Sequence, residues 1–327
     1  MYVINLFTSE GESYMKETTE LIQDILENIE KVIIGKREEI INIIKGIIAD
    51  GHILIEDVPG VGKTTLVKAL ARSIDLSYSR IQFTPDLLPS DITGISIFNQ
   101  KEMQFEFRKG PIFAHIVLAD EINRTSPKTQ SALLEVMEEN QVSEGINTYK
   151  LSKPFFVLAT QNPIEYEGTF TLPEAQLDRF MMKVSIGYPD KVSEAQVLAL
   201  YRNRKPLEEI EPVTNAEDII ALQNSCREIN VSDDINKYIV SIADATRNTR
   251  MLNLGMSTRA ALSLLRVAQA SAVVEGRSYV VPEDIKNNAV LVLGHRLTPS
   301  AEARANNYSS DKIIGDILKM VPVPKVN

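Results

Sequence analysis

Over the first 189 residues, segments in which apolar side chains recur at helical spacing alternate with compact apolar runs. Apolar side chains recur at helical spacing in 20–31, 38–49 and 128–139, which predicts amphipathic helices. Compact apolar runs separate these segments, at 52–56, 116–119, 155–159 and 182–186. Apolar runs of this length are typical of parallel strands that are buried on both faces. The alternation predicts an α/β domain in which helices cover both faces of a parallel sheet.

The pattern changes near residue 189, after which helical spacing is the only periodic signal. It predicts helices at 216–228, 232–246, 257–274 and 282–293, and a short helix at 312–320. Turn-forming residues dominate 84–110, and hairpins are predicted within that block and at 141–151. We therefore predict a loose leader over 1–16, the α/β domain over 17–189 and an all-α domain over 190–327.

Composition and charge narrow the classes of function. The chain has 327 residues, of which 44% are hydrophobic and 24% charged, so either half can bury a core. The net charge of −9 argues against nucleic-acid binding, because phosphates require clustered lysine and arginine. No apolar stretch is long enough for a membrane span, and the start lacks the features of a signal peptide. The lone Cys226 fits a reducing compartment, so we expect a cytoplasmic protein.

A phosphate-binding loop follows the apolar run at 52–56. Glycines let backbone N–H groups approach a polyphosphate, and the next helix adds partial positive charge at its N-terminus. Lys63 is predicted to contact the β- and γ-phosphates of ATP, and the Thr64 hydroxyl to hold Mg²⁺. The pattern G-x-x-x-x-G-K-[ST] is met except at its first position, where Asp57 replaces glycine. The predicted nucleotide-binding residues of the loop are Val58, Pro59, Gly60, Val61, Gly62, Lys63, Thr64 and Thr65.

Polar residues that end two of the apolar runs complete a hydrolytic site. A Mg²⁺-dependent hydrolase needs one carboxylate near the metal and another that activates the attacking water. Asp120 is the candidate metal ligand and Glu121 the candidate general base. Apolar runs that end in Asp-Glu are common, so this assignment depends on its pairing with the loop. Asn162 could orient the water, although an Asn-Pro pair alone indicates only a turn.

Two arginines are candidates for stabilising the charge that develops on the phosphoryl oxygens. Arg179 stands in the string LDRF and Arg259 in the string STRA. Spacing alone does not distinguish either arginine from a charge on the surface of a helix.

Several long strings over residues 32–300 resemble the MoxR family of AAA+ ATPases. They are DVPGVGKTT at 57–65, LADEINR at 118–124, ATQNPIEYEGTF at 159–170, LPEAQLDRFM at 172–181 and STRA at 257–260. These strings occur in family order over most of the chain and are far more specific than the phosphate loop alone. Asp57 resembles a variant that this family tolerates.

The resemblance implies a AAA+ P-loop NTPase αβα domain with a parallel sheet, followed by an all-α lid domain. It implies that Lys63 is the Walker A lysine, that Asp120 and Glu121 are the Walker B carboxylates, and that Asn162 is sensor 1. The block at 84–110 resembles the helix-2 insert of this clade, and 141–151 its pre-sensor-1 hairpin.

The remaining site residues also follow from the resemblance. Arg179 resembles the arginine finger that is given to a neighbouring subunit, and Arg259 resembles the sensor 2 arginine. The stretch that contains Ile34 and Gly35 would contact the adenine. Since Lys63 and Arg259 would then hold one nucleotide from two bodies, hydrolysis is expected to change the angle between the sheet domain and the lid.

The family resemblance also carries expectations about partners. Its members usually form hexameric rings and act as chaperone-like ATPases in the maturation of partner complexes. The partners often carry a von Willebrand factor A domain, and some members are linked to metal-cofactor insertion. The leading hypothesis is therefore ATP-driven remodelling or assembly of a protein client. A DNA-acting motor, a small-molecule kinase and a chelatase-type metal-insertion subunit remain alternatives.

Overall fold

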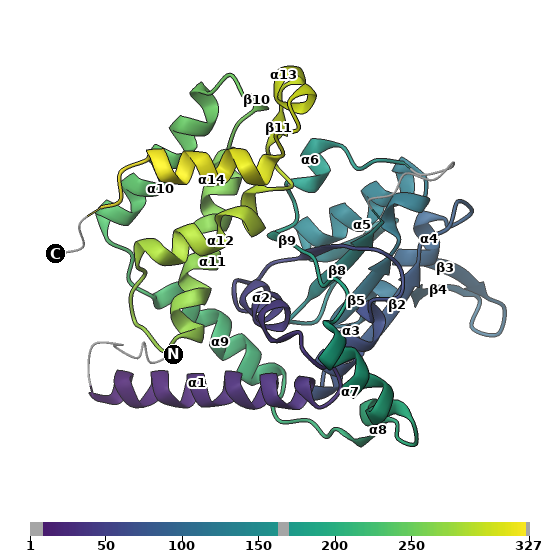
Figure 1. Cartoon of the computed structure of the whole chain (residues 1–327). Helices are drawn as coiled ribbons and strands as arrows, with labels where there is room; N and C mark the ends of the chain where they lie inside the picture. Colours follow the sequence, from purple (N-terminus) through teal and green to yellow (C-terminus); the bar gives the residue numbers. More distant parts are fainter. Residues whose placement is uncertain (1–8, 163–169, 325–327) are drawn as a thin grey trace.

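A five-stranded parallel sheet forms the centre of the first domain in the computed structural model, which describes residues 9–162 and 170–324 (Figure 1). The strand order is β2-β5-β8-β1-β9, and every neighbouring pair is parallel. The strands are β1 (Ile53–Glu56), β2 (Tyr78–Gln82), β5 (Ile116–Asp120), β8 (Phe156–Gln161) and β9 (Met182–Val184).

Helices cover both faces of this sheet, as the buried apolar runs predicted. Alternate strand residues face opposite sides. Ile116 and Leu118 pack in one cluster with helix α3 (Lys63–Ser73). Val117 and Ala119 pack in another with helix α5 (Pro127–Glu139). The predicted α/β class is therefore confirmed. Strand β2 was not predicted, because Ile81 is its only fully buried side chain and its sequence is otherwise polar.

The helices of the second half form a bundle beside the sheet domain (Figure 1). Besides α3 and α5, the described helices include α1 (Ser9–Glu30), α2 (Arg37–Ile48), α7 (Lys191–Tyr201), α8 (Pro206–Glu209), α9 (Ala216–Glu228), α10 (Asp233–Asn248), α11 (Thr258–Val274), α12 (Pro282–Leu293), α13 (Ala301–Ala305) and α14 (Ser310–Met320). Short helices α4 (Pro89–Thr93) and α6 (Glu174–Leu177) belong to the sheet domain. Helices α1 and α2 pack against α11 and so connect the two halves.

Two details of the structure differ from the sequence prediction. Helix α1 begins at Ser9, inside the predicted loose leader, and Met15 is buried in the core. An amphipathic helix forms there because its apolar face packs against α3 and α11. The region 190–327 is also not wholly helical, since β10 (Leu252–Leu254) and β11 (Thr298–Pro299) pair as a short antiparallel ribbon.

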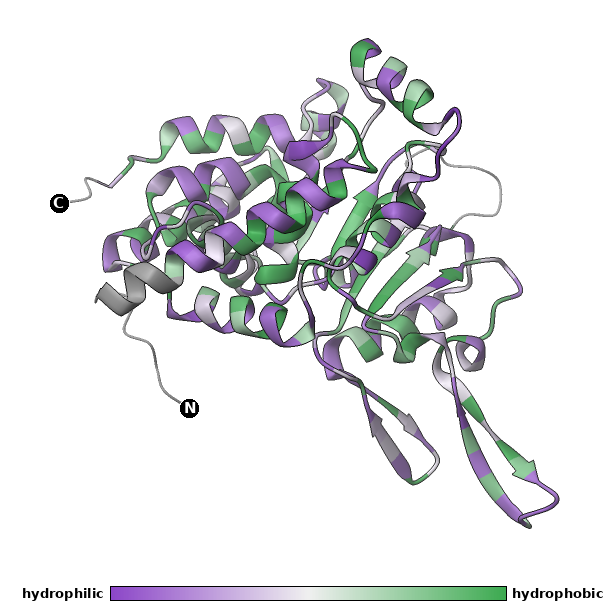
Figure 2. Ribbon diagram, turned by 90° about the horizontal axis from the view of Figure 1, so that it is seen from below, coloured by the Kyte–Doolittle hydropathy of each residue, from purple (hydrophilic) through white to green (hydrophobic). Residues whose placement is uncertain are grey.

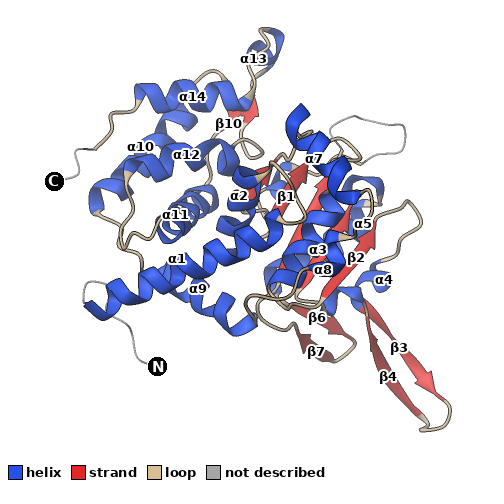
Figure 3. Ribbon diagram, turned by 60° about the horizontal axis from the view of Figure 1, so that its bottom comes forward, coloured by secondary structure: helices blue, strands red, loops and turns tan. Residues whose placement is uncertain are grey.

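Two antiparallel hairpins project from the same side of the sheet domain (Figures 2 and 3). One pairs β3 (Gly94–Asn99) with β4 (Gln104–Lys109), and the other pairs β6 (Gln141–Glu144) with β7 (Asn147–Lys150). Both lie within blocks where hairpins were predicted. The longer hairpin exposes apolar side chains along its length, namely Ile95, Phe98, Met103 and Phe105. Exposed apolar groups gathered on a projecting element are typical of a binding surface.

Cys226 lies inside the lid bundle on α9 and is 1% exposed. Burial raises the pKa of its thiol to about 12. At pH 8 the reactive thiolate therefore amounts to only about one part in 10⁴. We expect Cys226 of the native protein to react slowly with a disulfide reagent at pH 8. In denaturant, one thiol per chain should react rapidly. Fast reaction of the native chain would show that α9 opens readily.

Over 9–162 and 170–324, no helix combines the length and the apolar character that a bilayer crossing requires.

Candidate active site

The phosphate loop joins the carboxyl end of β1 to the start of α3. Gly60 and Gly62 have φ angles of +88° and +85°, which favour glycine, and Gly62 caps the helix that begins at Lys63. A Cβ atom built on either glycine meets no atom within 4 Å, so both face open space. The Lys63 ammonium lies over the loop and donates to the carbonyls of Asp57 and Val58, at 3.1 and 2.9 Å. The loop therefore forms an open concavity with a cation at its rim.

Asp57 anchors the beginning of this loop to another part of the chain. Its Oδ2 atom accepts hydrogen bonds from the backbone N–H groups of Ile186 and Gly187, at 2.6 and 2.7 Å. Its Oδ1 atom accepts from the Val58 N–H at 3.0 Å. The carboxylate is 6% exposed and cannot exchange these donors for water at low cost. The departure from glycine is thus a structural feature, because it ties the loop to the segment that follows β9.

Replacing Asp57 with asparagine is expected to lower the free energy of unfolding by about 2 kcal/mol, the usual worth of a hydrogen bond to a charged group. Asparagine has only one oxygen for donors that now use two. ATP affinity should fall as well, because the loop loses its anchor. Denaturant unfolding and a nucleotide-binding titration measure the two effects. Asp86→Asn, at an exposed aspartate, is the control. An Asp57→Asn variant with unchanged stability would contradict this role.

The carboxylate of Asp120 stands at the carboxyl end of β5, beside β8. Its Oδ1 atom accepts from the Thr160 hydroxyl at 2.6 Å. Its Oδ2 atom pairs with Arg80 of β2 at 2.6 Å, a contact that the sequence did not predict. The Arg80 guanidinium already neutralises the Asp120 carboxylate, which is the negative charge that would attract Mg²⁺. Any metal here would have to share Asp120 with Arg80 or displace it.

Glu121 is held in a conformation that is rare for its residue type. Its φ angle is +58°, in the left-handed region where a side chain is strained. Gln82 Nε2 and Arg124 Nη1 both donate to its Oε2 atom at 2.9 Å, and its own N–H donates to the Thr160 hydroxyl at 2.8 Å. The two donors fix the position of this carboxylate just after β5.

Asn162 follows β8, the strand that lies between β1 and β5. In the register of β8 with β1, Glu56 is opposite Gln161, which places Asn162 at the level of the phosphate loop. Its carbonyl accepts from Asn123 Nδ2 at 3.4 Å. The predicted loop, the two carboxylates and Asn162 therefore meet at one edge of the sheet. The rest of the family string that follows, 163–169, lies outside the described residues.

A cavity of about 370 Å³ adjoins the phosphate loop and has a mostly apolar lining. Ile34, for which an adenine contact was predicted, lines this cavity. Gly35 has a φ of +71°, and a Cβ there would lie 2.1 Å from the Ser193 hydroxyl of α7. Gly35 therefore allows α7 to approach, and it shapes this cavity without lining it.

Helix α7 supplies one wall of the cavity, which the sequence analysis missed. Its contributions are Glu194, Val197, Leu198 and Tyr201, with Tyr188 and Pro189 just before the helix. No signal in the sequence marked this wall, because apolar positions along a helix normally indicate packing in a core. In the structure, Leu198 is 71% exposed and Ser193 is the only buried residue of this helix. Apolar residues that no core buries indicate a ligand or a partner.

Arg179 and Arg259 lie together, away from the phosphate loop. Arg179 pairs with Glu138 Oε2 at 3.0 Å, and Arg259 pairs with Oε1 of the same carboxylate at 2.9 Å. Arg179 also donates to the Leu134 carbonyl at 2.6 Å. The two guanidinium groups share this one carboxylate, and Glu135 and Glu139 line the same cavity as Arg179 and Glu138.

The arginine pair occupies the opposite edge of the sheet from the loop. Both residues line a cavity with His52, Phe155 and Met181, which immediately precede β1, β8 and β9. The strands β1 and β8 have 4 and 6 residues, so the two edges are separated by about 13 to 20 Å. The expectation that Arg259 and Lys63 hold one nucleotide within a single chain is therefore wrong for this arrangement. The lid packs on α1 and α2, which carries Arg259 to the amino edge.

Comparisons with known proteins identify the family. A model of the ATPase family associated with various cellular activities (AAA) matches residues 52–182, and a AAA lid domain model matches 244–317. The chain is 39% identical to the chaperone MoxR1 of Mycobacterium tuberculosis, over 91% of this chain and 81% of that protein. The chain belongs to the MoxR family of AAA+ ATPases.

Other similarities cover nearly the whole chain. The protein YeaC of Bacillus subtilis is 49% identical, over 95% of this chain and 98% of that protein. A crystal structure of a Cytophaga hutchinsonii protein superposes with a TM-score of 0.90 at 43% identity, covering 96% of this chain and 98% of the other. The lid model begins at 244, within α10, and α7 and α8 lie beside the sheet domain, apart from the bundle (Figure 1).

The residues present in this MoxR-family ATPase fit a nucleoside triphosphate. The two open glycines, the Lys63 ammonium and the N-terminus of α3 form a cradle for phosphates. Asp120 and Thr64 offer oxygen atoms, the ligands that Mg²⁺ prefers.

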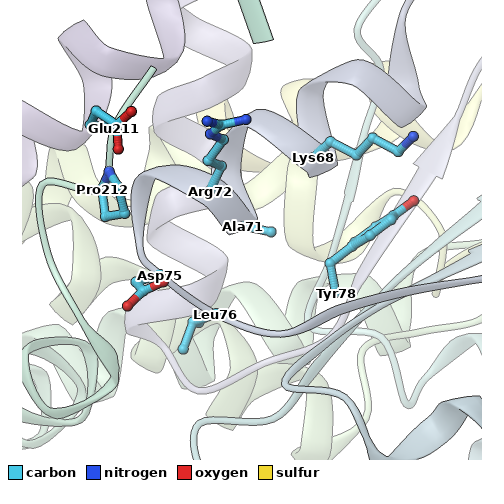
Figure 4. A pocket seen from close by; sticks show the side chains of 8 residues that line it. All are labelled: Lys68, Ala71, Arg72, Asp75, Leu76, Tyr78, Glu211 and Pro212. Atoms are coloured by element: carbon cyan, nitrogen blue, oxygen red, sulfur yellow. The ribbon is translucent and has the colours of Figure 1, made fainter. Parts of the chain in front are cut away.

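A further cavity, of about 410 Å³, lies on the outer side of α3 (Figure 4). Lys68 and Arg72 extend from the helix, and Tyr78 begins β2. The carboxylates of Asp75 and Glu211 balance the two cations. Arg72 donates to the Glu208 carbonyl at 3.0 Å.

Proposed function

We propose that this MoxR-family ATPase hydrolyses ATP with Mg²⁺ at a site that two copies of the chain share. The main support is that the proposed catalytic residues lie at two opposite edges of the sheet. The loop, Asp120, Glu121 and Asn162 occupy the carboxyl edge. Arg179 and Arg259 occupy the amino edge and cannot reach the same phosphates.

At the carboxyl edge, each residue has a distinct role in the proposed site. Lys63 and the backbone N–H groups of the loop bind the phosphates, and Thr64 and Asp120 hold Mg²⁺. Bound Mg²⁺ neutralises the phosphate oxygens and orients them. Glu121 accepts a proton from the attacking water, and Asn162 orients that water. The cavity beside α7 accepts the adenine.

At the amino edge, Arg179 and Arg259 are proposed to act on the nucleotide of a neighbouring copy. A guanidinium beside the γ-phosphate stabilises the charge that develops during transfer. Glu138 holds the two arginines in register until the neighbour's phosphates replace it. Membership in the AAA family supports closure of such contacts into a ring, for which we propose a hexamer.

Subunit mixing tests the shared site. Lys63→Ala removes the phosphate-binding cation but keeps both arginines, whereas Arg179→Ala keeps the loop. Each variant alone should turn over little ATP. A one-to-one mixture should recover activity well above the sum of the two, because some interfaces then combine an intact loop with an intact Arg179. A mixture with no gain would contradict a site formed between copies.

The proposed client is a protein, remodelled or assembled in the cytoplasm with ATP as the energy source. The apolar side chains exposed on the β3–β4 hairpin support a protein client. The net charge of −9 weighs against DNA. The name of the relative chaperone MoxR1 points the same way. We propose a protein with a von Willebrand factor A domain as the candidate partner, which co-purification with an ATP-trapped variant can test.

A further inference from the structure

One buried arginine of the lid holds the chain segment that carries Arg179. Arg296 follows α12 and is 5% exposed. Its Nε atom donates to Asp178 Oδ1 at 2.8 Å, and Nη1 donates to the Met181 carbonyl at 3.0 Å. Nη2 donates to the carbonyls of Phe180 and, at 3.2 Å, of Asp178. The guanidinium therefore binds the backbone on both sides of Arg179.

Neighbouring lid residues make further hydrogen bonds to the same segment. The ring N–H of His295 donates to the Phe180 carbonyl at 3.1 Å, and the Ser257 hydroxyl donates to the Asp178 carboxylate at 3.3 Å. Arg296 is anchored within the lid as well, since it donates to the Val292 carbonyl and, at 3.2 Å, to the Ser263 hydroxyl. Helices α11 and α12 thus share one polar cluster with the segment 178–181.

Breaking the hydrogen bonds of this polar cluster has a large free-energy cost. A guanidinium buried away from water must keep its acceptors, because a buried charge without partners is strongly destabilising. Moving the segment without the lid would strip Arg296 of its partners at Asp178, Phe180 and Met181. In the part of the chain that the structure describes, α9 to α14 contribute no residue to the cavity beside the phosphate loop. The lid bundle is therefore fastened to Arg179 and has no direct contact with its own nucleotide cavity.

We propose that Arg296 is a positioning residue that makes Arg179 and the lid one rigid body, so that the lid of each subunit responds to the nucleotide of its neighbour. The inference rests on the shared site proposed above. When the neighbour's γ-phosphate draws Arg179 toward it, α11 and α12 follow, and loss of that phosphate releases them. The lid then reports hydrolysis across the interface, from one subunit to the next.

Hydrogen exchange in mixed oligomers tests this coupling. ¹⁵N-labelled Lys63→Ala subunits, which bind no ATP of their own, are mixed with unlabelled wild-type subunits. A non-hydrolysable ATP analogue is expected to slow amide exchange in the labelled peptides of 258–274 and 282–293, because only the neighbour's nucleotide can act on them. The slowing should be lost when the labelled subunit also carries Arg296→Lys, since one ammonium cannot span the acceptors that the guanidinium joins.

Two further variants distinguish the proposed coupling from a general loss of structure. Asp178→Ala removes the side-chain acceptor from the other side of the pair and should likewise abolish the lid response. Arg227→Lys alters another ion pair between lid and core, Arg227 with Asp50, and should leave it unchanged. Arg296→Lys should also lower ATP turnover at least tenfold with ATP affinity within about twofold of wild type, and should be complemented by Lys63→Ala. A purely structural role would lower affinity and give no complementation.

The outcomes separate the two proposals. A lid response that persists in both the Arg296→Lys and the Asp178→Ala backgrounds overturns the role of Arg296, even if the site is shared. If Arg179→Ala and Lys63→Ala fail to complement each other, the shared site itself is wrong, whatever the Arg296 variants do.

Discussion

Replacement of Glu121 with glutamine is expected to reduce ATP turnover by about 10²- to 10⁴-fold, the usual contribution of a general base. ATP binding should remain within about threefold of wild type, because Glu121 does not belong to the phosphate cradle. Gln82 and Arg124 both donate to one oxygen of Glu121, so a glutamine oxygen in the same place keeps both hydrogen bonds. The substitution therefore removes basicity with little change of shape.

Steady-state phosphate release and a nucleotide-binding titration give the two quantities for Glu121→Gln. Glu228→Gln, at an exposed carboxylate on α9, is the matched control and should behave as wild type. Undiminished turnover would rule out Glu121 as the base. Loss of binding would instead make it a ligand of the nucleotide or metal. Because the variant accumulates the ATP state, it is also the form with which to isolate a protein client.

Removal of the Arg179 side chain should have a comparable or larger effect on turnover. An arginine supplied from a neighbouring subunit is worth about 10³- to 10⁵-fold in rate. Its loss should leave ATP affinity nearly unchanged, because the phosphate loop of the same chain remains intact. The variant also loses the Glu138 ion pair and the hydrogen bond to Leu134, but its side chain is 30% exposed and these contacts contribute modestly to stability.

Turnover, ATP affinity and oligomeric state are measured together for Arg179→Ala. Arg304→Ala, at an exposed arginine on α13, is the control. Arg179→Lys should recover only part of the rate, because an ammonium lacks the planar fork that matches a phosphate. Full activity of Arg179→Ala would rule out the finger assignment. Loss of assembly would place Arg179 in the contact between subunits and leave its action on phosphate unsupported.

Local patterns in the sequence predicted the parts of the site that one strand and one turn can build. A buried parallel strand needs a run of apolar residues, and whatever follows it must lie at the carboxyl edge of the sheet. The positions of Lys63, Asp120 and Asn162 therefore follow from the runs that precede them. Strand β2 was missed because it is polar, and with it the contacts of Arg80 and Gln82 with the two carboxylates.

The family membership and the α/β class predicted from the sequence are confirmed, whereas the roles of individual site residues stay predictions. The departure at Asp57 could not be explained from the sequence, because its partners Ile186 and Gly187 lie 129 and 130 residues away. The position of α7 could not be predicted from the sequence either, because its apolar side chains line a cavity that only folding creates beside the phosphate loop.

The sequence by itself determined the phosphate loop, the carboxylates at the strand ends and the helical second half, because each depends on the periodicity and chemistry of adjacent residues. The tertiary structure alone decided which edge of the sheet each arginine occupies. Nothing near Arg259 in the sequence indicates that α11 packs on α1 and α2, or that Glu138 lies between it and Arg179. That packing depends on apolar faces far apart in the chain, and it places both arginines away from the phosphate loop, which is the arrangement on which the proposed shared site rests.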